Sequence, residues 1–132
     1  MINIICVGKI KEEYLSLMIN DYCKRINKYH KLNIIELKDS NIKEEGDLIL
    51  KHIKPTDFIV TMEIEGKMMS SRDMALNIES WLTHYSSITF IIGGSTGIDE
   101  RVKELSKFRL SFGLNTFPHG LFRGILLEQI YR

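Results

Sequence analysis

The chain of 132 residues has 44% hydrophobic and 27% charged side chains, which is the balance of a globular protein and excludes a disordered or fibrous chain. The lysines and arginines number 18 and the aspartates and glutamates 17, so a formal net charge of +1 does not by itself indicate a nucleic-acid-binding protein. No apolar run approaches the roughly 20 residues that span a bilayer, and no signal segment opens the chain, so we expect neither secretion nor membrane insertion.

Strand and helix patterns alternate along the first half of the chain. Residues Met1–Val7 form a β-rich run, and the helical spacing of apolar residues over Glu12–His30 then predicts a helix. Leu32–Leu37 returns to strand character, and Lys43–Ile53 predicts a weaker helix. Pro55 ends this helix, because proline disfavours helical geometry in the residue before it.

The alternation continues to the end of the chain, where Phe58–Ile64 predicts a strand that is followed by a turn at Gly66. The later elements are expected to be a helix capped by Ser70, a strand over Ser87–Ile92, a short helix over Asp99–Lys107, a strand over Phe108–Phe112 and a last helix from Pro118 to Arg132. Strands separated by helices require crossover connections. The sequence therefore predicts a single α/β domain, with a mostly parallel sheet of about five to six strands and helices on both faces.

The cysteines and histidines give no sign of a disulfide or a metal. Cys6 and Cys23 form no C-x-x-C pair, and we expect both to be reduced and mostly buried thiols of a cytosolic protein. His30, His52 and His84 lie near predicted helix ends, which favours the surface. Since none of them stands at ligand spacing to another histidine or cysteine, we predict no metal.

Three consecutive predicted strands end in segments of unusual composition. These segments are Met62–Lys67, Gly93–Gly97 and Gly113–Gly120. In an open α/β sheet, ligands bind beyond the carboxyl ends of the strands. If the three strands are parallel, the three segments share one edge of the sheet, and we expect them to form one cleft.

The glycine-rich segment Gly93–Gly97 permits more than one interpretation. It is no Walker A loop, since no lysine follows Gly97, and the dinucleotide fingerprint is absent. It matches the G-x-S-x-G nucleophile elbow of serine hydrolases, with Ser95 as nucleophile and Asp99 and His119 as partners. This hydrolase is the less favoured alternative, because hydrolases of that fold are generally much larger and Asp99 follows Ser95 too closely.

Asp99 has a simpler explanation, since a carboxylate at the N-terminus of a helix interacts favourably with the positive end of the helix dipole. Three glycines within five residues indicate a backbone with positive φ or one that something approaches closely. We favour close approach of a ligand, which would be bound by main-chain N–H and C=O groups.

Several motifs occur in a fixed order along the chain. They are Gly8-Lys9, Glu65-Gly66-Lys67-Met68, Ile92–Gly97, Leu110-Ser111-Phe112, Thr116–His119, Arg123 and Leu127–Arg132. Together they resemble the ribosomal large-subunit methyltransferase H family of the SPOUT class, over essentially the whole chain. The resemblance implies an α/β fold with a C-terminal trefoil knot, a homodimer and S-adenosyl-L-methionine as methyl donor. The implied reaction is N3-methylation of a pseudouridine in 23S rRNA within the assembled ribosome, in the cytoplasm.

The resemblance also implies which residues bind the cofactor. The positions that it carries over are Met62, Gly93, Phe112, Gly113, Leu114, Asn115, Thr116 and Phe117. We expect loop amides and carbonyls to read the adenine, and Met62, Leu114 and Phe117 to supply apolar walls. Gly93 is expected to keep a side chain out of the pocket.

Three residues of the last helix are candidates for contact with the RNA or the reacting base, namely His119, Arg123 and Arg132. At 100° per residue, Arg123 and Arg132 are half a turn out of phase and should occupy opposite faces of the helix. No residue is assigned as the general base.

The resemblance has one departure, since family members typically continue beyond the position of Arg132 with a short aromatic-histidine-basic tail associated with the active site. We expect cofactor binding not to depend on that tail. A non-catalytic RNA- or ribosome-binding module of the same fold is the alternative. The region around Asp39–Gly46 is also short, as after a loop deletion.

Overall fold

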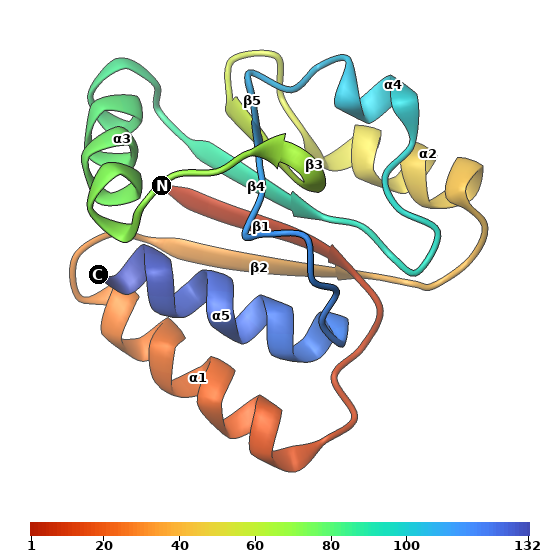
Figure 1. The fold of residues 1–132 in the computed structure, drawn as a ribbon, viewed down its shortest axis with the longest axis horizontal. Coiled ribbons are helices and arrows are strands. Elements are labelled where there is room, and N and C mark those ends of the chain that lie inside the picture. The colour runs from red at the N-terminus through yellow and green to blue at the C-terminus, as the bar shows by residue number, and fades with distance from the viewer.

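Five parallel strands form one sheet in the computed structural model, which describes residues 1–132 apart from the side chain of His119 (Figure 1). Their order across the sheet is β2-β1-β4-β3-β5, and all four pairings are parallel. The strands are β1 (Ile2–Val7), β2 (Leu32–Leu37), β3 (Phe58–Lys67), β4 (Ile88–Ile92) and β5 (Phe108–Leu110). The predicted α/β fold with a parallel sheet is confirmed.

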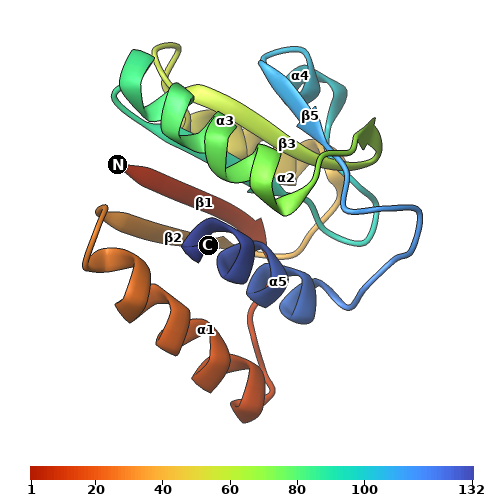
Figure 2. The same cartoon turned by 60° about the vertical axis from the view of Figure 1, so that its left-hand side comes forward.

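A helix follows every strand and covers one of the two faces of the sheet. The helices are α1 (Glu13–Asn27), α2 (Ile42–His52), α3 (Ser71–His84), α4 (Glu100–Lys103) and α5 (His119–Tyr131). Helices α1, α3 and α5 lie on one face, and α2 and α4 lie on the other (Figures 1 and 2). No helix in the described part of the chain is long and apolar enough to cross a membrane.

The strands are apolar on both faces because both faces are covered. In β1, Ile4 and Cys6 pack against the layer of α1, α3 and α5, whereas Ile5 and Val7 pack against the layer of α2 and α4. All four side chains are at most 1% exposed. The period of two along a strand sends successive side chains to opposite faces, so an unbroken apolar run fills two separate core layers.

Helix α5 runs across the sheet from its carboxyl edge to its amino edge. It packs against α1 and α3, and the two chain ends lie at the amino edge (Figure 1). A helix rises about 1.5 Å per residue, so the ends of α5 are separated by roughly 20 Å. The start of α5 therefore lies at the edge where ligands of parallel sheets bind, and Arg132 lies at the opposite edge.

Several predicted element boundaries differ from the structure, and α1 ends at Asn27, three residues before the predicted end. Strand β3 continues to Lys67, so Gly66 lies in the strand and the predicted turn is wrong there. A Cβ on Gly66 would be 2.8 Å from the carbonyl oxygen of Arg109, and glycine is needed because β5 passes so closely. Strand β5 ends at Leu110, two residues before the predicted end, and α4 is shorter than predicted.

Candidate cofactor-binding cleft

A cleft of about 520 Å³ opens at the carboxyl ends of β3, β4 and β5. Residues of all three unusual segments line it, from Met62–Glu65, from Gly93–Gly97 and from Gly113–Pro118. The predicted convergence of these segments in one cleft is therefore confirmed. The volume lies within the range of roughly 300–1,000 Å³ that is typical of small-molecule sites.

All but one of the residues predicted to bind the cofactor line this cleft. The seven are Met62, Gly93, Phe112, Gly113, Asn115, Thr116 and Phe117. Leu114 does not line the cleft, and its side chain is 82% exposed. The expectation that Leu114 forms an apolar wall of the cleft is therefore wrong, because the loop turns at Gly113 with a φ of 118°.

The apolar walls come partly from side chains that sequence reasoning did not single out. Ile92 and Leu110, at the ends of β4 and β5, line the cleft beside Met62. Phe122 on α5 also lines it, with ring centroids 5.4 Å from Phe112 and 6.3 Å from Phe117. Aromatic pairs at such distances stabilise a structure by about 0.5–1.5 kcal/mol beyond their area burial, so Phe122 ties the loop to the helix.

The hydroxyl of Ser111 shapes the loop that closes the cleft. Ser111 is 3% exposed, and its Oγ donates to the carbonyl oxygen of Ile64 at 2.8 Å and accepts from Gly113 N at 3.0 Å. One side chain thereby joins the end of β3 to the loop after β5. The positive φ of Gly113 belongs to the region that glycine adopts at no steric cost.

The glycines after β4 are explained by the chain itself. Gly97 has a φ of 90°, and its N–H donates to the carbonyl oxygen of Gly94 at 3.1 Å. A Cβ on Gly93 would be 2.6 Å from the carbonyl oxygen of Gly97, and one on Gly94 would be 3.1 Å from Glu45 Oε1. Gly93 lines the cleft, and the nearest obstacle to a Cβ there is the loop backbone. The expectation that Gly93 keeps a side chain out of the pocket remains a prediction.

The structure gives no support to a catalytic triad around Ser95. Ser95 is exposed, and the carboxylate of Asp99 binds Arg101 instead, with Oδ1 2.9 Å from Arg101 N and Oδ2 2.8 Å from Arg101 Nη2. The hydrogen bond from the Arg101 side chain is the main cause that lowers the pKa of Asp99. Asp99 is the N-cap of α4, as its position suggested. The side chain of His119 lies outside the described residues, so its predicted roles remain predictions.

The two arginines of the last helix occupy opposite environments. Arg123 is 2% exposed, and its Nη1 and Nη2 donate to Glu36 Oε2 at 2.6 Å and to the carbonyl oxygen of Gly8 at 3.1 Å. A side chain so enclosed has no free surface for RNA, which corrects that prediction for Arg123. Arg132 has a side chain that is 62% exposed and paired with Glu128. This difference in burial agrees with the prediction that the two side chains occupy opposite faces of the helix.

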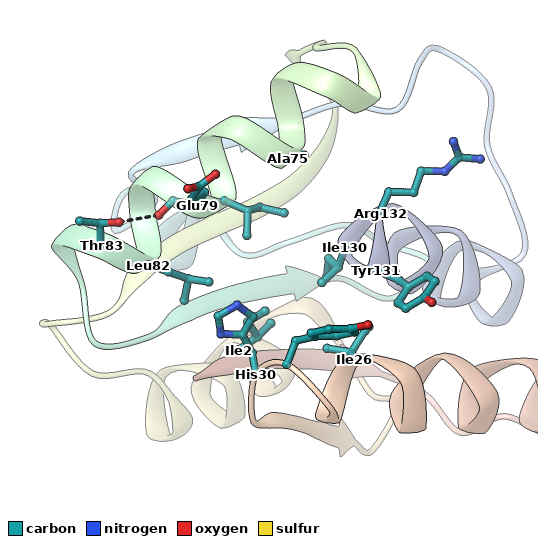
Figure 3. A pocket seen from close by; sticks show the side chains of 12 residues that line it. Ile2, Ile26, His30, Ala75, Glu79, Leu82, Thr83, Ile130, Tyr131 and Arg132 are labelled. Atoms are coloured by element: carbon teal, nitrogen blue, oxygen red, sulfur yellow. Dashed lines mark hydrogen bonds between the residues drawn. The ribbon is translucent and has the colours of Figure 1, made fainter.

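A second cleft of about 580 Å³ lies between the C-terminal ends of α1, α3 and α5 (Figure 3). Ile26, Ile78 and Ile130 form part of its apolar lining. Of the predicted site residues only Arg132 lines it, and Ile2 places it at the amino edge of the sheet. The structure thus separates Arg132 from the first cleft.

Among the described residues, no group of three or more histidines, cysteines, aspartates or glutamates could hold a metal ion. Cys6 and Cys23 are both free thiols, the first buried and the second half-buried, as predicted. The residues with polar side chains that line the first cleft are Glu63, Glu65, Ser95, Lys103, Asn115 and Thr116.

A comparison of the sequence with protein families identifies the class to which this α/β chain belongs. The family model described as "Predicted SPOUT methyltransferase" matches residues 1–132, so the chain is a methyltransferase of the SPOUT class, whose fold includes a trefoil knot. Proteins of Clostridium botulinum strains 657 and Kyoto are 48% identical to this chain over an alignment of 145 residues. Each alignment covers 99% of this chain and 91% of the relative. A protein of strain Hall is 47% identical with the same coverage. All three are named ribosomal RNA large subunit methyltransferase H, and this chain belongs to that family.

Proposed function

We propose that this protein methylates ribosomal RNA of the large subunit, at N3 of a pseudouridine in 23S rRNA, with S-adenosyl-L-methionine as methyl donor. The observation that carries the proposal is the single cleft in which Met62, Gly93 and the loop after β5 meet. We also propose that residues 1–132 form one methyltransferase domain that acts in the cytoplasm. The names of the related proteins support ribosomal RNA as the substrate.

The lining of the cleft fits S-adenosyl-L-methionine. Met62, Ile92 and Leu110 offer an apolar wall for a flat base, and the main chain of residues 112–117 offers N–H and C=O groups to its edge. A Cβ built on Gly113 meets no atom within 4 Å, so a ligand can approach the loop backbone. When bound, the cofactor supplies a methyl group on a positively charged sulfur.

The residues of this chain contribute mainly by positioning. A cleft that holds the donor beside an RNA base converts a bimolecular encounter into a step within one complex, which can supply much of the rate. The N3 proton of the base must leave around the time of transfer, and this requires a base or a group that stabilises the anion. We assign no residue to that role, and His119 remains a candidate for contact with the reacting base.

We propose that the protein acts as a homodimer. Exposed apolar side chains on α1, on α5 and on the loop after β5 support this proposal, among them Tyr14, Leu17, Leu114, Leu121 and Tyr131. Arg132 supports it too, because α5 carries this residue to the edge of the sheet opposite its own cleft. In a dimer, Arg132 could contact RNA that is bound at the cleft of the partner subunit.

The proposed function is tested by incubating the protein with ribosomes that lack the modification and radiolabelled S-adenosyl-L-methionine. Label is expected in 23S rRNA, and mass spectrometry of RNA fragments is expected to place it on one pseudouridine. Methyl transfer to another nucleotide would correct the substrate and keep the class. Saturable binding to ribosomes without binding of the methyl donor would identify a non-catalytic module instead.

A further inference from the structure

The first cleft has one charged wall among otherwise apolar and main-chain surfaces. The charged side chains that line it are Glu63, Glu65 and Lys103. The two glutamates come from the carboxyl end of β3 and the lysine from the end of α4. Glu65 belongs to a motif that carries the family resemblance, whereas Glu63 and Lys103 do not, so the wall needs its own explanation.

A bulge in β3 brings the two glutamates to the cleft. Met62 and Lys67 both pair with Leu110 of β5, so residues 63–66 leave the ladder between them. The bulge is held by the bond from Ser111 Oγ to the carbonyl oxygen of Ile64. Bulges that redirect side chains are common beside functional sites, and this one places two carboxylates on the cleft wall.

Lys103 is surrounded by carboxylates but is not tightly bonded to any of them. Its Nζ lies 3.5 Å from Glu63 Oε1, 3.5 Å from Glu65 Oε1 and 3.8 Å from Glu100 Oε1. Charge-assisted hydrogen bonds are usually about 2.7–2.9 Å long, so donors of this ammonium remain available to a ligand. Burial opposes the charged form, but the carboxylates outweigh it and raise the pKa of Lys103.

Glu63 has a buried oxygen without a hydrogen bond. Its side chain is 2% exposed, and Oε2 accepts from Thr61 Oγ1 at 2.6 Å, whereas Oε1 has no hydrogen-bond partner. A buried carboxylate oxygen without a donor is costly. Because Glu63 lines the cleft beside Lys103, a ligand that brings a positively charged donor would remove this cost.

The charges of the wall match one part of the cofactor better than the others. Adenine and ribose are neutral, and a ligand group that carries only positive charge would leave Lys103 without a partner of opposite sign. An α-amino acid group carries an ammonium and a carboxylate side by side, which complements a wall that carries both signs. We propose that Lys103 binds the α-carboxylate of S-adenosyl-L-methionine and that Glu63 and Glu65 bind its α-ammonium. This inference rests on the proposed function.

The arrangement would fix the direction of the cofactor in the cleft. The amino-acid end would lie against the charged wall, and the base would lie against Met62, Ile92 and Leu110 with its edge toward the loop after β5. Two anchors at opposite ends of one molecule restrict its rotation, so the group between them is presented in one orientation. The charged wall therefore supplies orientation, in addition to affinity.

Three related ligands test the proposal by isothermal titration calorimetry. S-adenosyl-L-methionine and S-adenosyl-L-homocysteine carry the amino-acid end, and 5′-methylthioadenosine lacks it. In the unaltered protein we expect the first two to bind at least about tenfold more tightly than the third. In Lys103→Met the first two should weaken about tenfold, whereas 5′-methylthioadenosine should bind as before. Glu65→Gln should act in the same direction by a smaller factor.

Glu100→Gln is the matched control, because Glu100 also faces Lys103 but does not line the cleft. Its affinities should stay within about twofold of the unaltered protein. Equal weakening of all three ligands by Lys103→Met, or no weakening, would overturn the subsite. Weakening of S-adenosyl-L-methionine alone by Glu65→Gln would also overturn it, since the wall would then recognise the charged sulfur. If the unaltered protein binds none of the three ligands, the proposed function itself fails.

Discussion

Arg123 Nη1 lies 2.6 Å from Glu36 Oε2, and this ion pair joins α5 to β2 across 87 positions of the sequence. The two partners differ in burial, since the side chain of Arg123 is 2% exposed and that of Glu36 is 39% exposed. Nη2 of Arg123 also donates to the carbonyl oxygen of Gly8, where β1 has just ended. The guanidinium thus holds the start of the last helix against the carboxyl ends of two strands.

The unequal burial predicts unequal effects of removing either partner. Glu36→Ala leaves a guanidinium buried without its counter-charge, and we expect it to lower the free energy of unfolding by about 3–5 kcal/mol. Arg123→Met leaves a carboxylate that water can reach, and we expect a loss of about 1–2 kcal/mol. Urea denaturation followed by circular dichroism measures both. Glu128→Ala, which breaks the exposed pair with Arg132, is the control and should cost less than about 1 kcal/mol.

A larger loss for Arg123→Met than for Glu36→Ala would contradict this account of the ion pair. Binding of Arg123 to RNA makes a different prediction, because Arg123→Met would then weaken binding to ribosomes without destabilising the protein. Measuring both properties on the same variant separates a structural role from contact with RNA.

The sequence predicted the order of strands and helices and the place of the cleft. Apolar periodicity was sufficient for this, because each strand of a parallel sheet is buried on both faces and each helix on one. The convergence of the segments Met62–Lys67, Gly93–Gly97 and Gly113–Gly120 also followed, since parallel strands end at one edge. These predictions depend on local patterns and on one general rule of α/β folds.

Properties that depend on contacts between distant segments could not be predicted from those patterns. Gly66 resembles a turn residue, but it lies in a bulged strand because the backbone of Arg109 passes beside it. In the sequence Arg123 resembles a surface arginine, but in the fold it is paired with Glu36 of β2. The contacts of Lys103 with Glu63 and Glu65 gave no local signal either, since they depend on the bulge of β3. Each of these contacts joins residues that are far apart in the sequence.

Gly93→Ala is predicted to damage the cleft through the backbone. The new Cβ would be 2.6 Å from the carbonyl oxygen of Gly97, and the loop must shift because no flexible side chain can move away. We expect the affinity for S-adenosyl-L-methionine to fall at least about tenfold, and stability to fall by about 1–3 kcal/mol. Calorimetry and thermal unfolding measure the two effects.

Thr96→Ala is the matched control in the same loop, because Thr96 is exposed and does not line the cleft. Its affinity should stay within about twofold of the unaltered protein. If Gly93→Ala binds the cofactor with full affinity, the loop does not contribute to the cleft in the way that the structure indicates.

Ser111→Ala tests the bond that joins β3 to the loop after β5. The substitution leaves Gly113 N and the carbonyl oxygen of Ile64 without their partner, and we expect a loss of about 1–3 kcal/mol in stability. Because both groups belong to segments of the cleft, the affinity for S-adenosyl-L-methionine should fall as well. Ser106→Ala is the control, since the Ser106 hydroxyl donates to the carbonyl oxygen of Phe108, a residue that does not line the cleft. Similar losses of affinity in both variants would mean that the effect of Ser111 is not local.

The buried thiol of Cys6 is expected to make the stability of the protein fall at alkaline pH. Burial, which outweighs the nearby charge of Arg123, raises the pKa of the Cys6 thiol to about 11. In the unfolded chain the thiol ionises near pH 9, so between pH 9 and 11 the unfolded state binds fewer protons than the folded one. The stability that comes from the protonated thiol is therefore complete below pH 9 and is lost progressively as the pH rises to 11, by about 2–3 kcal/mol.

Urea denaturation between pH 8 and about 10.5 measures this loss, and Cys6→Ala isolates it from the titration of lysines and tyrosines. The variant starts from a lower stability, because a buried sulfur is removed, but its stability should fall less steeply with pH than that of the unaltered protein. Cys23→Ala is the control, since Cys23 is only half-buried. Burial raises its pKa as well, so that variant should retain most of the slope. Parallel curves for the unaltered protein and Cys6→Ala would show that the thiol of Cys6 does not titrate differently in the folded and unfolded states.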